Sequence, residues 1–276
     1  MVNLIQYFEN IPSLHRSIIL VGGITLFWLI EGLVPTRRLA YKKWRHALPN
    51  FFFTATSVLV NFFLAFLLLN TADWTQANGF GILHIVALPL WLYVVLSVLL
   101  LDFIGAYLAH LVEHKVKPLW MVHLVHHSDH HVDTTTANRH HPLESLVRFS
   151  FTLLAVFILG APIGVVMLYQ SLSVVLSQFN HANINLPVKL DQWLSYVLVT
   201  PHMHKVHHHY VLPHTDSNYG NIFAIWDRLF GTYTYLDAAC IVYGVDVFPN
   251  EEENSRVGSL LKQPFQSYQK PTTQSQ

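Results

Sequence analysis

The residues of this chain with the clearest chemical potential are its histidines, which outnumber all lysines and arginines together, 19 to 16. Sixteen of them lie between His110 and His214, and eight of these fall into three groups with helical spacing. Residues three and four positions apart share one face of a helix, so each group can direct its imidazoles to one point. The three groups are His110 and His114; His123, His126 and His127; and His204, His207 and His208.

This spacing predicts metal binding. Pairs of histidines on one helix are a common way to hold a metal ion, and neutral imidazole suits zinc, copper, iron and nickel. Eight histidines exceed the positions of a tetrahedral zinc site, so the pattern favours two metals over one. Two neighbouring metals can bind and activate a shared small ligand.

Other interpretations of the histidines remain open at this point. A histidine-rich surface tract can collect metal adventitiously, although two copies of one spacing argue against it. A metal-binding membrane transporter or sensor is a second alternative, but transporters place ionisable groups near the bilayer midplane, and these groups fall at the ends of apolar segments. We interpret His15, His46 and His84 as surface or hydrogen-bonded residues, and His130 and His131 as solvated loop residues.

The elements that must position the histidines are strongly apolar. Apolar types make up 52% of the chain and charged types 12%, about half the charged share of soluble globular proteins. The net charge is zero, so no basic excess is present to bind nucleic acid. The single cysteine, Cys240, excludes a disulfide framework and any cysteine-based metal site. The composition therefore predicts an integral membrane protein.

Three apolar segments precede the histidine groups, at 17–34, 51–69 and about 82–109. Each is long enough to cross a bilayer core of about 30 Å. The loop 70–81 contains no lysine or arginine, and the densest basic cluster follows the first segment: Arg37, Arg38, Lys42, Lys43 and Arg45. The positive-inside rule places this cluster, and with it the histidines, on the cytoplasmic side.

The apolar stretch 146–177 is interrupted by Gly160, Pro162 and Gly164, and glycine and proline end helices. We expect a helical hairpin that returns to the cytoplasmic side, because an odd number of crossings would separate the histidine groups. Each arm is short, so we expect the hairpin only to dip into the bilayer. The predicted fold is all-α: an integral membrane helical bundle with about four to five membrane segments, the last two a hairpin, and a cytoplasmic histidine-rich helical cap. A single domain should cover 1–249, with its histidine core at 102–232 and a polar, disordered tail at 250–276.

From about Asp102 to Thr232 the chain resembles the fatty acid hydroxylase and sterol desaturase superfamily. The motifs that carry the resemblance are HLVEH at 110–114, HLVHHSD at 123–129, RHHPLE at 139–144, HAN at 181–183, TP at 200–201 followed by HKVHH at 204–208, NYG at 218–220, and WDRLFGT at 226–232. Leu111 departs from the arginine that many members have after the first histidine, which bears on the subfamily and not on the metal site.

The resemblance implies a non-haem di-iron centre that uses dioxygen to hydroxylate or desaturate a lipid, such as a sterol, a fatty acyl or sphingolipid chain, an ether lipid or a carotenoid. Two Fe²⁺ ions are the expected cofactors, with zinc as a substitute in purified protein. The sequence contains no nucleotide-binding fingerprint. The electrons should therefore come from a separate protein of cytochrome or ferredoxin type.

Further site residues follow from the same motifs. His181 is the expected ninth metal ligand, and His141 is either a tenth ligand or a structural partner. Asp102 lies inside a membrane segment, where an ionisable residue is a functional candidate, and we expect it to pair with a histidine. Asp129 and Asp227 are expected to accept hydrogen bonds from metal-binding histidines and so orient their rings.

Overall fold

The computed structural model describes residues 1–38 and 41–268. The regular secondary structure of these residues is helical, with two isolated backbone bridges and no named strand among them. Five helical stretches within this part of the chain are long and apolar enough to cross a membrane. They are α2 (Ser13–Leu33), α3 (Lys43–Ala77), the continuous run of α4 (Leu90–Asp102), η2 (Phe103–Leu108) and α5 (Ala109–Lys115), α7 (Pro142–Leu159) and α8 (Ile163–His181). The prediction of an all-α membrane bundle with about four to five segments is confirmed.

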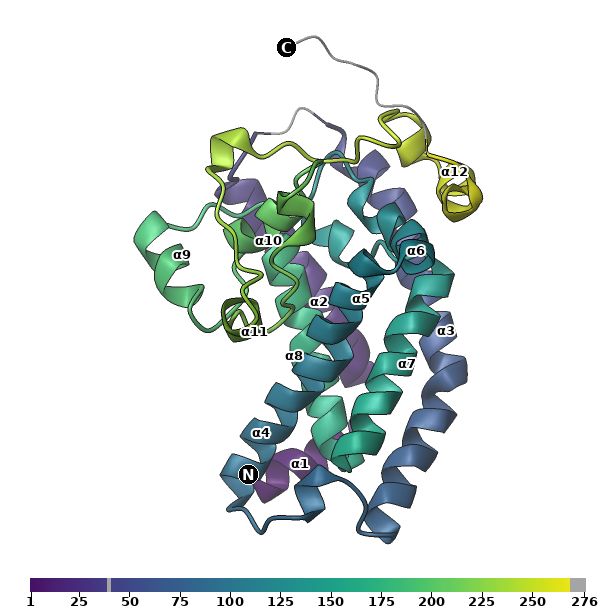
Figure 1. Ribbon diagram of the computed structural model, residues 1–276, viewed down its shortest axis with the longest axis vertical. Coiled ribbons are helices and arrows are strands. Elements are labelled where there is room, and N and C mark those ends of the chain that lie inside the picture. The colour runs from purple at the N-terminus through teal and green to yellow at the C-terminus, as the bar shows by residue number, and fades with distance from the viewer. Residues whose placement is uncertain (39–40, 269–276) are drawn as a thin grey trace.

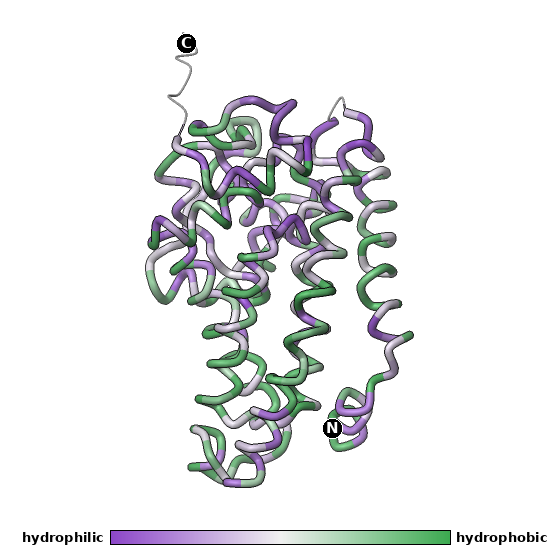
Figure 2. The backbone as a smooth tube through the Cα atoms, turned by 90° about the vertical axis from the view of Figure 1, so that its right-hand side faces the viewer, coloured by the Kyte–Doolittle hydropathy of each residue, from purple (hydrophilic) through white to green (hydrophobic). Residues whose placement is uncertain are grey.

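The long helices form the body of the molecule, and short helices form a cap at one end (Figure 1). In the body, α3 packs on α7, while α2 and α4 pack on α8. The end away from the cap holds α1 (Val2–Glu9) and η1 (Ile82–His84). The cap contains α6 (Lys117–His127), η3 (Thr134–Asn138), α9 (Val188–Leu194), α10 (Pro201–His207), η4 (His214–Asp216), α11 (Ile225–Leu229), η5 (Ala238–Cys240), η6 (Glu253–Ser255), α12 (Val257–Lys262) and η7 (Gln263–Phe265). Figure 2 shows that hydrophobic residues dominate the body and hydrophilic residues gather in the cap.

The predicted hairpin turns at Gly160, which ends α7 in the left-handed conformation (φ 68°) before Pro162 precedes α8. A side chain at this position would be strained, and its Cβ would lie 2.1 Å from the carbonyl oxygen of Phe80. The side chain of Gln76, at the end of α3, donates a hydrogen bond to the Gly160 carbonyl (2.7 Å). The hairpin therefore reaches the far end of the bundle, and the expectation that it only dips into the bilayer is wrong.

The third long helix changes its winding just before the first histidine pair. Residues Phe103–Leu108 form a π-helical stretch between α4 and α5. A π turn makes bonds to the fifth residue along the chain instead of the fourth, and such turns are frequent at functional sites. This stretch changes the direction in which His110 and His114 point relative to the residues of α4. The spacing of residues in the sequence did not indicate this change.

The segment after residue 249 differs from the disordered tail expected there. It contains η6, α12 and η7, and Leu260 is fully buried in a small core with Phe53 and Val125. The Arg139 guanidinium donates a hydrogen bond to the Asn254 carbonyl. The segment has few apolar residues, but Leu260 and Leu261 of α12 pack against the core of the cap and hold the segment there. Residues 269–276 of the expected tail lie outside the described residues.

Candidate metal centre

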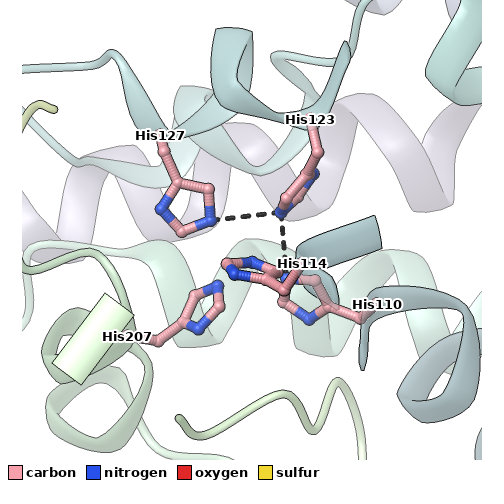
Figure 3. Close-up of side chains that lie close together, drawn as sticks. All are labelled: His110, His114, His123, His127 and His207. Atoms are coloured by element: carbon pink, nitrogen blue, oxygen red, sulfur yellow. Dashed lines mark hydrogen bonds between the residues drawn. The ribbon is translucent and has the colours of Figure 1, made fainter. Parts of the chain in front are cut away.

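Nine buried histidines come together in the cap in two adjoining groups. The five-histidine group consists of His110, His114, His123, His127 and His207, and the four-histidine group of His126, His181, His204 and His208. Within each group, one nitrogen of every ring lies within 4.8 Å of the others. Figure 3 shows the five-histidine group, whose rings converge from α5, α6 and α10. The structure thus brings together all eight clustered histidines and His181.

The two copies of the HxxHH motif are each divided between the groups. In α6, His123 and His127 are four residues apart and join the five-histidine group, while His126 turns to the other group. In α10 the outer pair, His204 and His208, joins the four-histidine group instead. Each motif therefore contributes to both groups, and the two helices do so in opposite senses.

The short helices that carry these motifs have defined starts. Thr200 caps α10 by accepting a hydrogen bond from the backbone N–H of Met203 (3.2 Å), with Pro201 as the first helical residue. A proline also lies in the first turn of α6. These signals fix where each helix begins, and so which way its histidines point.

In five of the nine rings, Nδ1 lies next to an oxygen that can only accept a hydrogen bond from it. The partners are the Tyr219 carbonyl for His110 (2.8 Å), the Asp216 carboxylate for His114 (3.2 Å), the Glu144 carboxylate for His123 (2.7 Å), the Ser177 carbonyl for His181 (2.8 Å) and the Ser217 carbonyl for His207 (2.6 Å). Such a partner holds the proton on Nδ1 and leaves Nε2 with a free lone pair.

These Nε2 atoms face one another. The Nε2 atoms of His110 and His123 are 3.0 Å apart, although both rings carry their proton on Nδ1. In the other group, Nε2 of His181 lies 3.1 Å from that of His126 and 3.0 Å from that of His204. For His110 and His123 the two lone pairs at this distance repel unless a cation lies between them. Ligand nitrogens about 2.1 Å from one metal are about 3 Å apart when they meet near a right angle, so these separations fit metal binding.

Burial keeps the rings neutral. It lowers the pKa of His208 to about 3. Burial first, and then the neighbouring imidazoles, also lower the pKa well below the ordinary value for His123, His126, His127, His204 and His207. Several of these nitrogens have no hydrogen-bond partner, among them both nitrogens of His208 and Nε2 of His207. Buried polar atoms without partners are costly, and a bound metal would satisfy one nitrogen of each ring.

Glu144 accepts hydrogen bonds from three side chains at the site, a role that the sequence did not indicate. One of its carboxylate oxygens accepts hydrogen bonds from Nδ1 of His123 (2.7 Å), Nδ1 of His140 (2.7 Å) and Nε of Arg148 (2.9 Å). Arg148 also lies 2.9 Å from the buried Glu113 carboxylate. Glu144 belongs to the RHHPLE run and lies four residues after His140, so helical spacing could have indicated their contact.

Two of the three aspartates expected to support the metal ligands, Asp102 and Asp129, have other partners. Asp102 accepts hydrogen bonds from the backbone N–H groups of Ile222 and Phe223 and from the Trp226 indole, instead of pairing with a histidine. It thereby joins the third long helix to the loop before α11. Asp102 lies just before the π-helical stretch and His110 just after it. The Asp102 side chain therefore points to this loop, whereas the His110 ring points to the metal centre.

Among the described residues, the hydrogen-bond partners of Asp129 lie outside the two histidine groups. Asp129 accepts hydrogen bonds from His46 (2.8 and 2.9 Å) and Thr136 (2.7 Å), and so joins α3 to η3. Asp227 does help to position a metal ligand, through the backbone at Tyr219. It accepts the backbone N–H groups of Tyr219 (2.7 Å) and Gly220 (2.8 Å), and the Tyr219 carbonyl is the partner of His110.

His141, the candidate tenth ligand, lies outside both groups. Its Nδ1 accepts the backbone N–H of Leu143 (3.2 Å), so the ring caps the start of α7. A cap must point back along its own helix, and this turns the ring away from the metal centre. His130 and His131 also lie outside both groups.

Comparisons with known proteins agree with this arrangement. The family described as fatty acid hydroxylase matches residues 94–232. The chain is 30% identical over 145 residues to the ornithine lipid hydroxylase OlsE of Rhizobium tropici, covering 52% of this chain and 43% of that protein. It is 31% identical over 145 residues to the alkylglycerol monooxygenase of Homo sapiens, covering 51% of this chain and 30% of that protein.

The matched region spans less than half the length of these curated relatives. No solved structure matches the chain. The family match contains all nine histidines of the two groups together with Glu144 and Asp227. This chain belongs to the fatty acid hydroxylase family.

Proposed function

We propose that this chain is a membrane-bound di-iron oxygenase that inserts a hydroxyl group into a lipid. The observation that carries the proposal is the pair of adjoining groups of buried, neutral histidines, in which Nε2 atoms of neighbouring rings lie 3.0 Å apart. The relatives support hydroxylation over desaturation, because one is named a hydroxylase of a lipid and the other a monooxygenase of alkylglycerol.

The chemistry divides between the metals and the chain. Two iron ions bound to the nine histidines would supply the redox chemistry that reduces dioxygen. In the overall reaction a C–H bond is replaced by C–O, and the second oxygen atom leaves as water after taking up two electrons and two protons. The chain holds the ligand nitrogens in place, fixes their tautomers through oxygens such as that of Glu144, and keeps the site buried away from water.

The cap is proposed to face the cytoplasm. Arg37 binds the carbonyl of Ala238 in the cap, so the basic cluster lies at the same end of the bundle as the histidines. The opposite end holds the loop that contains no lysine or arginine. By the positive-inside rule the cap is cytoplasmic. There a separate electron-transfer protein would supply the electrons, while the lipid enters from the bilayer.

A metal transporter or sensor fits the structure less well. Transporter sites lie near the bilayer midplane on broken helices, whereas all nine histidines here lie in or beside the cap.

Comparative lipid analysis tests the proposed activity. A strain that lacks the gene should lose a lipid species carrying one additional oxygen atom, and the wild-type gene should restore it. A His127→Ala gene, expressed at equal level in the membrane, should not restore it. Restoration by the His127→Ala gene, or the same lipid profile in all strains, would contradict the proposal.

A further inference from the structure

The lower edge of the cap carries an apolar surface that is formed by α9 and α11 (Figure 1). Its side chains are exposed: Trp193 is 77% exposed and Leu229 is 66% exposed. Soluble proteins rarely leave a large apolar surface in water, and such a surface marks a site that binds another protein or a membrane. The exposed residues, which we call the α9–α11 face, are Val188, Leu190, Trp193, Tyr196, Val197, Ile225, Leu229 and Phe230.

The charged residues of α11 turn away from this face. The Arg228 guanidinium donates hydrogen bonds to the Ser195 carbonyl (3.0 and 3.2 Å) and lies over the rings of Tyr196 and Tyr233, and so joins α11 to the end of α9. Asp227 is buried, and its carboxylate accepts backbone N–H groups of the preceding loop. The exposed side chains of 225–230 are therefore all apolar. Charged groups that turn to the protein interior are expected of a segment that faces lipid.

The α9–α11 face adjoins a membrane-spanning helix at the depth of the hydrocarbon. Phe230 stacks on Phe103 of the third long helix, with ring centroids 5.4 Å apart, and the Trp226 ring lies 4.9 Å from that of Phe103. This helix begins at Leu90, beside the exposed Trp91, and Phe103 lies about 20 Å along it at 1.5 Å per residue. A bilayer core of about 30 Å that begins there extends past Phe103. A partner protein on this face would have to displace lipid from the same helix, so the bilayer fits best.

Asp102 satisfies the backbone that precedes α11. Irregular backbone at membrane depth must find its hydrogen-bond partners within the protein, because water is absent there. The Asp102 carboxylate accepts the backbone N–H groups of Ile222 and Phe223 (both 3.2 Å) and the Trp226 indole N–H (3.1 Å). Two backbone hydrogen bonds of 3.0 Å also join this loop to residues 197–199. A carboxylate inside a membrane helix thus anchors a loop that is built to enter the bilayer.

We propose that α11 and the loop before it form a re-entrant segment, and that the α9–α11 face lies in the lipid of the leaflet on the cap side. Trp193 and Tyr196 lie at the boundary of this leaflet, where tryptophan and tyrosine are enriched. The exposed Lys189 of α9 extends to the headgroups. The same segment carries the Tyr219 carbonyl that orients His110, so the loop that contacts lipid also holds a metal ligand. The proposal rests on the membrane bundle and is independent of the oxygenase chemistry.

The test is fluorescence quenching of a single thiol label on the full chain in phosphatidylcholine vesicles. In a Cys240→Ser background, Leu229→Cys places the label on the α9–α11 face, whereas the native Cys240 places it on the cap outside this face. Phosphatidylcholine with a nitroxide on its acyl chain should quench the label at 229 and not at 240. Iodide, present on both sides of the membrane, should quench the label at 240 and not at 229.

Two results would overturn the proposal. If iodide quenches the label at 229 as strongly as the label at 240, the face lies in water. If the label at 229 is protected from both quenchers, protein covers the face, either a second copy of the chain or another partner. Neither result depends on bound metal or on turnover, so the test is separate from that of the proposed function.

A matched pair of charged variants tests the depth of α11. With the label at Ile225→Cys in the same background, Leu229→Asp should reduce quenching by the nitroxide lipid, because a carboxylate in hydrocarbon is costly and draws the segment towards water. Ala239→Asp adds the same charge at an exposed position outside the face and should leave this quenching unchanged. Equal quenching in the two variants would contradict an embedded segment. If Leu229→Asp does not fold, the uncharged Leu229→Asn takes its place, with a smaller reduction expected.

Discussion

At the level of single residues, the oxygens behind the rings are as important as the rings themselves. A carboxylate or carbonyl on Nδ1 decides which nitrogen of a histidine can bind metal. Glu144 does this for His123 and at the same time holds His140 and Arg148. One carboxylate thus fixes a ligand, a neighbour of the ligands and a charged residue of the bundle.

Glu144→Gln should weaken metal binding. One Glu144 oxygen accepts the hydrogen bonds from His123, His140 and Arg148, and the other is buried without a partner. In the glutamine variant the new NH₂ group either takes the second position and stays unpaired, or takes the first position and faces these three N–H donors. Replacing such partners of metal ligands typically costs about 10–100-fold in metal affinity. Chelator competition on the purified protein measures this directly, with Glu253→Gln at an exposed position as the control. Release of metal at the same chelator concentration from both variants would count against the role of Glu144.

His46→Ala should destabilise the protein without removing a ligand. The sequence indicated only a surface or hydrogen-bonded histidine, but its side chain is 9% exposed and lies between Asp129 (2.8 Å) and Asp133 (3.1 Å). Removing one partner of a buried ion pair costs about 3–5 kcal/mol. Thermal unfolding in detergent should show a large loss of stability, whereas the exposed His15→Ala should show little. Equal stability of the two variants would refute this assignment.

The same variant should change the acid sensitivity of the protein. Burial alone would raise the pKa of Asp133, but His46 and the hydrogen bonds from Tyr41 and Thr135 outweigh it and lower this pKa. A carboxylate with a lowered pKa stabilises the fold above its unfolded value of about 3.9, and this contribution is lost as the pH falls through the folded pKa. Without His46 the pKa of Asp133 rises, so stability should be lost at a higher pH than in the wild type.

At the level of the helices, periodicity and composition predicted the membrane segments, and the spacing of the histidines predicted which rings share a face. The division of each HxxHH motif between two groups could not be predicted, because it depends on how α6 and α10 are oriented in the cap. The π-helical stretch before His110 has no sequence signal of its own. For His141 the sequence could not separate a metal ligand from a structural partner, because a histidine that caps a helix has the same letter as a ligand. His46 is hydrogen-bonded, one of the two roles predicted for it, but its aspartate partners could not be predicted.

The turn of the hairpin provides a test at this level. Gly160→Ala should destabilise the bundle by more than the ~1–2 kcal/mol of a left-handed alanine, because its Cβ would also meet the Phe80 carbonyl. Gly79→Ala is the matched control, since Gly79 also has positive φ (57°) but no atom within 4 Å of an added Cβ. The difference in thermal stability between the two variants in detergent measures the effect of the contact between residue 160 and the Phe80 carbonyl. Equal losses would mean that the tip of the hairpin does not pack against the loop after α3.

For the whole molecule, the orientation in the membrane decides from which side electrons can arrive. Cys240 is the only cysteine and is exposed in the cap. A membrane-impermeant maleimide should not label intact cells but should label Cys240 once the membrane is opened. A Cys240→Ser variant controls for labelling of other proteins. Labelling from outside would place the cap, and the histidines with it, on the external face.

The metal content of the purified, active protein distinguishes a two-metal centre from a single site. If both histidine groups bind metal, elemental analysis should find close to two metal ions per chain, iron in the active form. His204→Ala should lower this number, because it removes a ring from the four-histidine group, whereas His141→Ala should leave it unchanged, because that ring caps α7. One metal ion or fewer per chain in fully active protein would contradict a two-metal centre.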